Sequence, residues 1–106
     1  MPYHEHPVSV PRAVHRHLRR GATKLVIVPA SKANSVGPNG MLNVNRKLGL
    51  TIRYVRGYES IGHALANERP EEYLHGATRD QVETFWRKRV SNKEARGPVV
   101  VYEVVR

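Results

Sequence analysis

The hydrophobic positions along the chain first indicate a helix near its start. Val10, Val14 and Leu18 are spaced four residues apart, which puts them on one face of a helix. Pro11 suits the first turn, and Gly21 can take the left-handed conformation that often ends a helix. The pattern therefore predicts an amphipathic helix with a narrow apolar stripe, whose other faces carry arginine and histidine.

Four later segments have the pattern of β-strands. Residues 24–28 begin with Lys24 and continue as an apolar run that ends at Pro29, as in a buried strand. Residues 41–47 and 50–58 alternate apolar and polar side chains, which predicts two strands with one solvent-exposed face each. Residues 99–105 are too apolar for a tail, so they predict a last strand inside a sheet.

The segments between these strands predict loops and helices. Residues 30–40 are almost all turn-forming, which predicts a long exposed loop. Ser60 can cap a short helix, and Thr78 with Gln81 forms a capping box before the clearest helix of the chain. In that helix Trp86 has core spacing. The element order predicts an α+β fold with a small, mostly antiparallel β-barrel flanked by helices.

Charge changes this picture more than length does. The 106 residues suffice for one domain, and they contain 18 Lys and Arg against 9 Asp and Glu. Residues 1–57 hold ten basic residues and one acidic residue, whereas residues 58–106 hold eight of each. An excess confined to one half is typical of a protein that binds a polyanion, most often nucleic acid, because binding releases counterions. A basic face kept only for solubility is the alternative.

The candidate nucleic-acid-binding residues follow from this excess. Arginine contacts phosphates through paired N–H groups and lysine acts as a point charge, while Tyr54 and Tyr58 could stack on bases. A hairpin turn at residues 48–49 would bring several of the basic residues together. The predicted site comprises Arg16, Arg19, Arg20, Lys24, Lys32, Arg46, Arg53, Arg56 and Tyr58.

The second half resembles a known family. Four segments carry the resemblance to the latter part of ASCH domains, which belong to the PUA-like superfamily: YESIGHAL at 58–65, NERPEE at 67–72, HGAT at 75–78 and GPVVVYEV at 97–104. The resemblance covers roughly residues 12–105. It implies a small β-barrel flanked by helices, a cleft between the two, and association with RNA.

The first half departs from the family signature. That signature is a glycine ending the first helix, a lysine two residues later, and often an acidic residue and an arginine in the next strand. Gly21 matches, but Thr23 takes the lysine position, with Lys24 one step late, and Val26 and Val28 take the other two positions. Some family members hydrolyse acetylated cytidine with a lysine, a threonine and a glutamate, and others are described as ribonucleases. Because most of this set is absent, the sequence favours binding over catalysis.

We therefore expect RNA or single-stranded nucleic-acid binding through a basic cleft formed by the first half. The domain is predicted at residues 11–106, after a flexible segment at 1–10. One alternative is a nucleoside amidohydrolase or ribonuclease that uses Thr23, Lys24 and either a second-half acid or His75. Another is a module whose basic face meets an acidic protein.

No cofactor is expected from the sequence. The pairs His4 with His6 and His15 with His17 offer imidazoles, but residues two apart on a helix point to different sides, so no metal site is predicted. The absence of cysteine, of a signal-peptide pattern and of a membrane-spanning apolar stretch predicts a soluble, cytoplasmic protein with no membrane partner.

Overall fold

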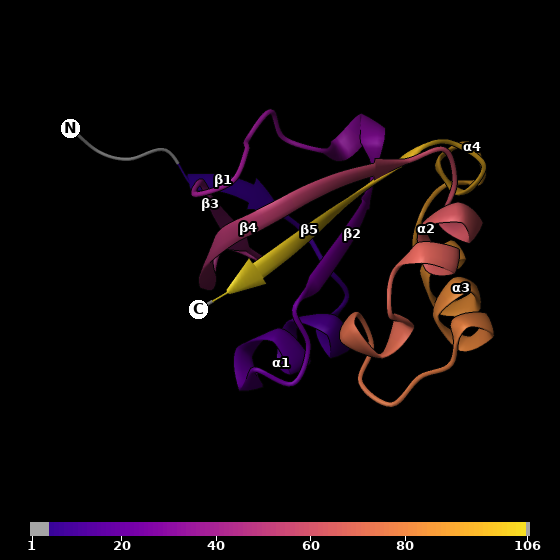
Figure 1. Cartoon of the computed structure of the whole chain (residues 1–106), viewed down its shortest axis with the longest axis horizontal. Coiled ribbons are helices and arrows are strands. Elements are labelled where there is room, and N and C mark those ends of the chain that lie inside the picture. Colours follow the sequence, from indigo (N-terminus) through magenta and orange to yellow (C-terminus); the bar gives the residue numbers. More distant parts are fainter. Residues whose placement is uncertain (1–4, 106) are drawn as a thin grey trace.

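A five-stranded mixed sheet organises the fold (Figure 1). The computed structural model describes residues 5–105. Its strands are β1 (Glu5–Val8), β2 (Leu25–Pro29), β3 (Met41–Val44), β4 (Leu48–Tyr58) and β5 (Val99–Val105). Their order in the sheet is β1-β3-β4-β5-β2, with β1 and β3 parallel and the other three pairs antiparallel. The predicted α+β class and the mostly antiparallel sheet are confirmed.

The helices begin and end where local capping chemistry allows. They are α1 (Arg12–Arg20), α2 (Ile61–Asn67), α3 (Arg79–Arg87) and α4 (Asn92–Ala95), with single 3-10 turns at Ala30–Lys32 and Pro70–Glu72. Gly21 ends α1 at a φ of 74°, and Thr78 with Gln81 forms the predicted capping box of α3. In Figure 1, α2, α3 and α4 gather at one end of the sheet, and α1 lies below the strands.

The expected closure of the sheet into a barrel is wrong. Within residues 5–105, β1 and β2 are the two edges of an open sheet. Closure would require the outer edge of β2 to pair with another strand. Instead the Trp86 side chain of α3 donates a hydrogen bond from Nε1 to the carbonyl oxygen of Ile27 in β2, at 3.0 Å. A helix side chain thus uses a backbone group that a closing strand would need.

Strand β1 was not predicted. It falls within residues 1–10, which we expected to be flexible, and it pairs with β3 from Glu5 opposite Met41 to Val8 opposite Val44. Its sequence gave no strand signal, because it is short and contains Pro7, which strands tolerate mainly at an edge. The division into segment 1–10 and domain 11–106 stays a prediction.

The hairpin between β3 and β4 differs from the prediction. We expected the turn at residues 48–49, but Leu48 and Gly49 already belong to β4, and Lys47 N–H bonds the Val44 oxygen at 3.0 Å across a turn made by Asn45 and Arg46. Both turn residues have a positive φ. The hairpin therefore begins earlier than the alternating pattern suggested.

A β-bulge in β4 decides which side chains share a face. The register of β4 against β5 shifts between Ile52 and Tyr54. Ile52 is fully buried, whereas Tyr54 is 49% exposed. Without the bulge, Tyr54, Arg56 and Tyr58 would lie on the face of Ile52, because strand side chains alternate. With it they lie on the other face, where Glu103 of β5 is the partner of Tyr54.

Candidate functional site

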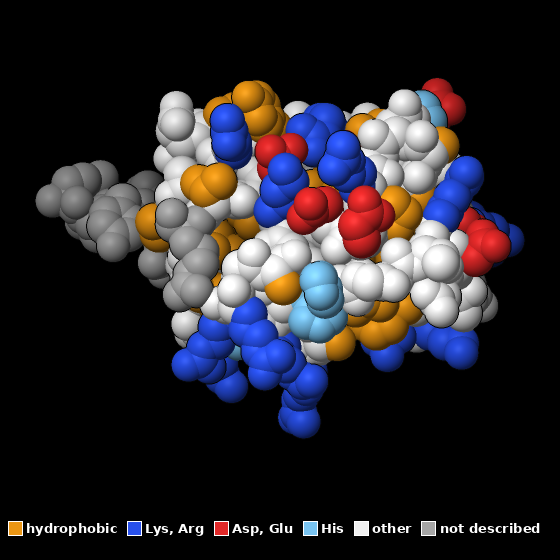
Figure 2. All heavy atoms as spheres, turned by 60° about the horizontal axis from the view of Figure 1, so that its bottom comes forward, with side chains coloured by type: hydrophobic (Ala, Val, Ile, Leu, Met, Phe, Trp, Pro, Cys, Tyr) orange, Lys and Arg blue, Asp and Glu red, His pale blue; other side chains and the backbone are white. Residues whose placement is uncertain are grey.

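Exposed arginines run along one side of α1. Val14 and Leu18 are buried, which fixes the apolar side of the helix against the core, as predicted. Helical spacing places the arginines within a sector of about 100° on the opposite side. They are Arg12, Arg16, Arg19 and Arg20. Figure 2 shows basic side chains gathered over α1 at the lower left. We call these four residues the α1 arginines.

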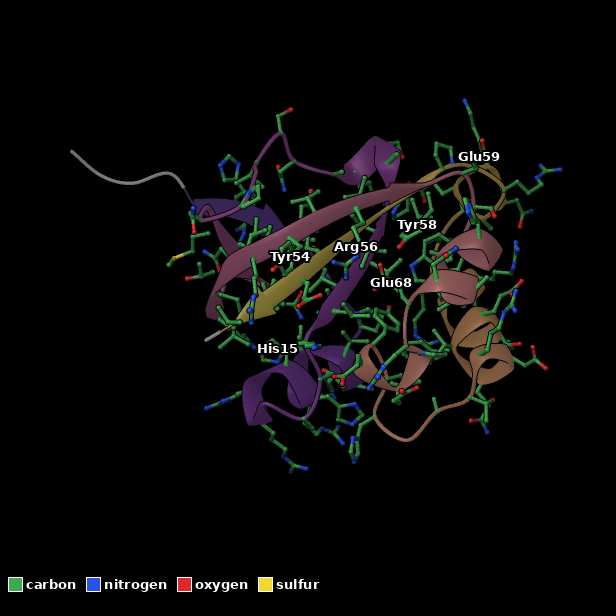
Figure 3. All side chains as sticks on the ribbon, in the orientation of Figure 1. His15, Tyr54, Arg56, Tyr58, Glu59 and Glu68 are labelled. Atoms are coloured by element: carbon green, nitrogen blue, oxygen red, sulfur yellow. The ribbon has the colours of Figure 1, made fainter. Side chains whose placement is uncertain are left out.

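A second group of predicted residues lies in an ion-pair cluster on β4 and β5. Arg56 Nη2 donates to Glu68 Oε1 at 2.8 Å and to Glu103 Oε1 at 2.9 Å, and Arg56 Nε donates to Glu68 Oε2. Tyr58 donates its hydroxyl proton to the same carboxylate at 2.6 Å. Lys24 Nζ lies 4.0 Å from Glu103 Oε2. Figure 3 shows Arg56, Tyr58 and Glu68 pointing toward one another, and we call these five residues the Glu68 cluster.

The electrostatics of the Glu68 cluster favour its ionised form. Burial alone would raise the pKa of Glu68, but hydrogen bonds from Arg56 and Tyr58 outweigh it and hold that pKa below the usual value. Burial, reinforced by the hydrogen bond to Glu68, raises the pKa of Tyr58. The cluster is therefore a carboxylate network whose basic members already have anionic partners, and a phosphate at Arg56 would compete with two carboxylates.

Tyr54 lies beside this cluster in a different environment. The guanidinium carbons of Arg53 and Arg56 are 5.6 and 5.9 Å from its ring centroid. Cations held over an aromatic face in this way keep the ring in a defined orientation. Because the ring is half exposed, it remains accessible for stacking on a planar ligand.

A pocket of about 650 Å³ lies between the two edge strands of the sheet. Pro7 and Val8 of β1 line one side, and the end of β2 lines another. The basic residues that line it are Arg12, Lys32, Arg46 and Arg89. Of the described residues that form its wall, none is an Asp or Glu. We call this the seam pocket, because it occupies the place where a barrel would close.

The structure thus divides the nine predicted site residues among three places. Arg16, Arg19 and Arg20 lie on α1. Lys24, Arg56 and Tyr58 belong to the Glu68 cluster, with Arg53 stacked beside it on Tyr54. Lys32 and Arg46 line the seam pocket. The residues expected to form one basic cleft thus fall into three groups, of which the α1 arginines and the seam pocket share Arg12.

Sequence reasoning missed two basic residues of the seam pocket, Arg12 and Arg89. Arg12 had a usable signal, since it lies four residues before Arg16 on the same side of a predicted helix. Arg89 had none. It follows α3, donates to the Phe85 oxygen at 2.8 Å and stacks over the Phe85 ring, so tertiary folding alone brings it to the pocket.

Two of the described histidines, His17 and His75, contact each other. The backbone N–H of His75 donates to His17 Nδ1 at 3.2 Å, and the two rings meet edge to face at 5.8 Å. Burial, and then His75, lowers the pKa of His17. Among the described residues, no three His, Cys, Asp or Glu side chains are grouped so that they could hold a metal ion. His4 lies outside this range.

Comparisons with known proteins show similarity in fold. No protein-family model matches the sequence, and no curated protein is significantly similar to it. The crystal structure of hypothetical protein PH0355 superposes with a TM-score of 0.82 at 17% identity, covering 95% of this chain and 97% of that one. The solution structure of protein PF0455 from Pyrococcus furiosus gives 0.69 at 18% identity, with 95% and 96% covered. Both likenesses extend over nearly the whole chain.

Within residues 5–105, every helix is too short or too polar to cross a bilayer.

Proposed function

We propose that this protein binds single-stranded nucleic acid, with RNA favoured, and that the α1 arginines are its main phosphate contacts. The observation that carries the proposal is the exposure of four arginines along one side of a single helix. Rigid helix positions hold such charges at a fixed spacing, and arginine contacts phosphate oxygens through two parallel N–H bonds.

The distribution of ion pairs supports the α1 arginines as the phosphate contacts. In the described part of the chain, Arg12, Arg16 and Arg20 have no carboxylate within ion-pair distance, whereas Lys24 and Arg56 are paired with Glu68 or Glu103. A basic side chain that has no carboxylate partner is available to neutralise a phosphate, and the counterion of that phosphate is then released. Half-exposed Tyr54 adds a surface on which a base can stack.

The preference for RNA comes from the resemblance to ASCH domains of the PUA-like superfamily, and membership of that family is part of the proposal. The matching Gly21 ends α1 beside the arginines. The open sheet departs from the closed barrel of that superfamily.

A salt titration tests the proposed function. Labelled single-stranded RNA, single-stranded DNA and duplex of one sequence are titrated by fluorescence anisotropy at several salt concentrations. We expect single strands to bind, with a log-log salt slope of about −0.7 per phosphate neutralised. The double variant Arg16→Gln with Arg20→Gln should reduce the magnitude of that slope by about 1.4.

The matched control removes the same charge elsewhere. Arg69→Gln with Lys93→Gln takes two exposed basic residues from the charge-balanced half of the chain. It should leave the slope nearly unchanged. Absence of binding to every strand at low salt, or equal effects of the two double variants, would refute the α1 arginines as the binding site.

A second candidate function is hydrolysis of an acylated nucleoside such as acetylated cytidine. It is favoured by one contact, the approach of Lys24 to Glu103, which joins the lysine to an acid of the second half. Thr23 does not favour it, because its side chain is buried. Release of acetate from acetylated cytidine that is lost in Lys24→Ala would support this function, and no release by the wild type would end it.

A further inference from the structure

The seam pocket carries more positive charge than its surroundings neutralise. Two of its four basic residues have partners: Lys32 Nζ lies 3.5 Å from Glu94 Oε2, and the Arg89 guanidinium carbon lies 3.5 Å from the Phe85 ring centroid. Arg12 and Arg46 have no carboxylate partner among the described residues. Arg89 has no carboxylate partner either, so three guanidinium groups line the pocket without one, and those of Arg12 and Arg46 have no other partner among the described residues.

Arg46 occupies a backbone conformation that its side chain does not favour. Its φ is 59°, directly after Asn45 at 53°. Tight hairpin turns with two positive φ values most often use Asn followed by Gly, because a Cβ is strained in the left-handed region. A strained residue in a pocket wall suggests a role for its side chain. Here the turn directs a long cationic side chain to the pocket where glycine would fit better.

The opposite rim of the pocket is held in place by Asn45. Its side-chain oxygen accepts from Val10 N–H at 2.8 Å, and its side-chain amide donates to the Val10 oxygen at 3.1 Å. This pair of hydrogen bonds to Val10 fixes the segment between β1 and α1, and with it the start of α1 at Arg12. The two unpartnered arginines thus lie on segments joined by the same turn, so their positions are set before a ligand binds.

Most of the remaining residues in the pocket wall are apolar, with Ser9 and Asn45 as polar exceptions. Its wall contains Val8, Val10, Pro11 and Pro29 from β1, β2 and the segments that flank them, and Val90 from the segment after α3. The volume of about 650 Å³ falls within the range of about 300–1,000 Å³ found for small-molecule sites. An apolar floor with cations at the rim suits a ligand that has a planar or apolar body and an anionic group.

We propose that the seam pocket binds a nucleotide that carries a phosphomonoester. A phosphomonoester has a charge of about −1.5 to −2 at pH 7, which suits a pocket lined by three guanidinium groups without a carboxylate partner better than the single charge of a phosphodiester does. The nucleotide has two possible sources, a free mononucleotide or the phosphorylated end of a strand. The second source rests on the proposed function, because the α1 arginines continue from Arg12 for about 12 Å along the helix.

The test compares strands that differ only in a terminal phosphate. One short single-stranded RNA is prepared with a phosphate at its 5′ end, at its 3′ end, or at neither end, and adenosine and uridine monophosphates serve as free nucleotides. Binding is measured by anisotropy and by calorimetry. For wild type we expect one phosphorylated strand, or a free nucleotide, to bind about tenfold more tightly than its unphosphorylated counterpart.

Two variants of the same hairpin make the test specific. Arg46→Gly suits the turn, so it keeps the fold while removing the guanidinium, and it should abolish the preference for the phosphorylated ligand. Lys47→Ala removes one charge from the neighbouring residue, which does not line the pocket, and should keep that preference.

The outcomes separate the two proposals. If strands bind at low salt but no phosphorylated strand or free nucleotide is preferred, the seam-pocket proposal is wrong and the proposed function stands. If free nucleotides bind wild type and not Arg46→Gly while no strand binds, the pocket proposal stands and the proposed function falls. A preference that survives in Arg46→Gly also overturns the pocket proposal.

Discussion

Arg46 and Asn45 are adjacent, both have a positive φ, and they should respond oppositely to the same substitution. Arg46→Gly removes a strained Cβ and leaves the backbone hydrogen bond of the turn in place, so we expect the free energy of unfolding to rise by about 0.5–1 kcal/mol. Urea denaturation followed by circular dichroism measures this change. A loss of stability in Arg46→Gly would show that its side chain supports the fold rather than a ligand.

Asn45→Gly is the contrasting variant. It relieves the same kind of backbone strain but deletes both side-chain hydrogen bonds to Val10. Each buried or half-buried bond of this type contributes about 0.5–1.5 kcal/mol, so the variant should lose about 1 kcal/mol net. Equal stability of Asn45→Gly and Arg46→Gly would contradict a stabilising role for the two hydrogen bonds between Asn45 and Val10.

For single residues, the sequence predicted the core position of Trp86 and the helix end at Gly21, but it did not predict the position of the hairpin turn. Trp86 was expected to pack in the core and is 2% exposed, and Gly21 ends α1 as predicted. The turn at Asn45 and Arg46 was not found, because the usual hairpin signal is Asn-Gly and alternation continues into residue 47. The strain that points to Arg46 is a backbone property, and a side-chain pattern does not carry it.

The Glu68 cluster links β4 and β5 to Glu68, the residue that ends α2, and it should make the packing of these elements depend on pH. The pKa of Glu68 is held below the ordinary value of 4.5 in the folded protein. A lowered pKa stabilises the fold above the unfolded value, and this contribution is lost as the pH falls through the folded pKa. Glu68→Gln should therefore cost about 1–3 kcal/mol near pH 7.

The measurement is the free energy of unfolding of wild type and Glu68→Gln from about pH 7 to about pH 3. The difference between them should be constant above about pH 5.5 and shrink below 4.5. Tyr58→Phe, which removes one donor to Glu68, should show a smaller version of the same change. Curves that stay parallel to the lowest pH would exclude Glu68 as the titrating group.

The elements themselves were largely predictable, because most carry a strong period or a cap. The helix at Thr78, the buried β2 and the final β5 all follow their patterns. The bulge in β4 was not predictable, since residues 50–58 alternate as if the strand were regular. That bulge turns Arg56 and Tyr58 toward Glu68 and Glu103, so the acidic partners of predicted basic residues were also missed.

The whole molecule is an open sheet with unequal protection of its strands. Strand β5 lies between β4 and β2, whereas β1 is an edge that pairs only with β3. Hydrogen exchange follows the local free energy of opening. In exchange measured by mass spectrometry, we expect amides of β5 to be the slowest and those of β1 to be the fastest among the strands. Faster exchange in β5 than in β1 would contradict this order.

The seam pocket exists because the sheet is open between β1 and β2, so ligand binding there should affect these edge strands. Closing the barrel would fill the space between β1 and β2 with backbone, but Trp86 occupies the edge of β2 and leaves a basic pocket there. Since Pro7 and Val8 line that pocket, a bound nucleotide stabilises the conformation in which β1 is paired. A phosphorylated nucleotide should therefore slow exchange in residues 6–12 of wild type and leave β5 unchanged. In Arg46→Gly the same nucleotide should slow neither, which separates protection by the ligand from a general effect of added phosphate.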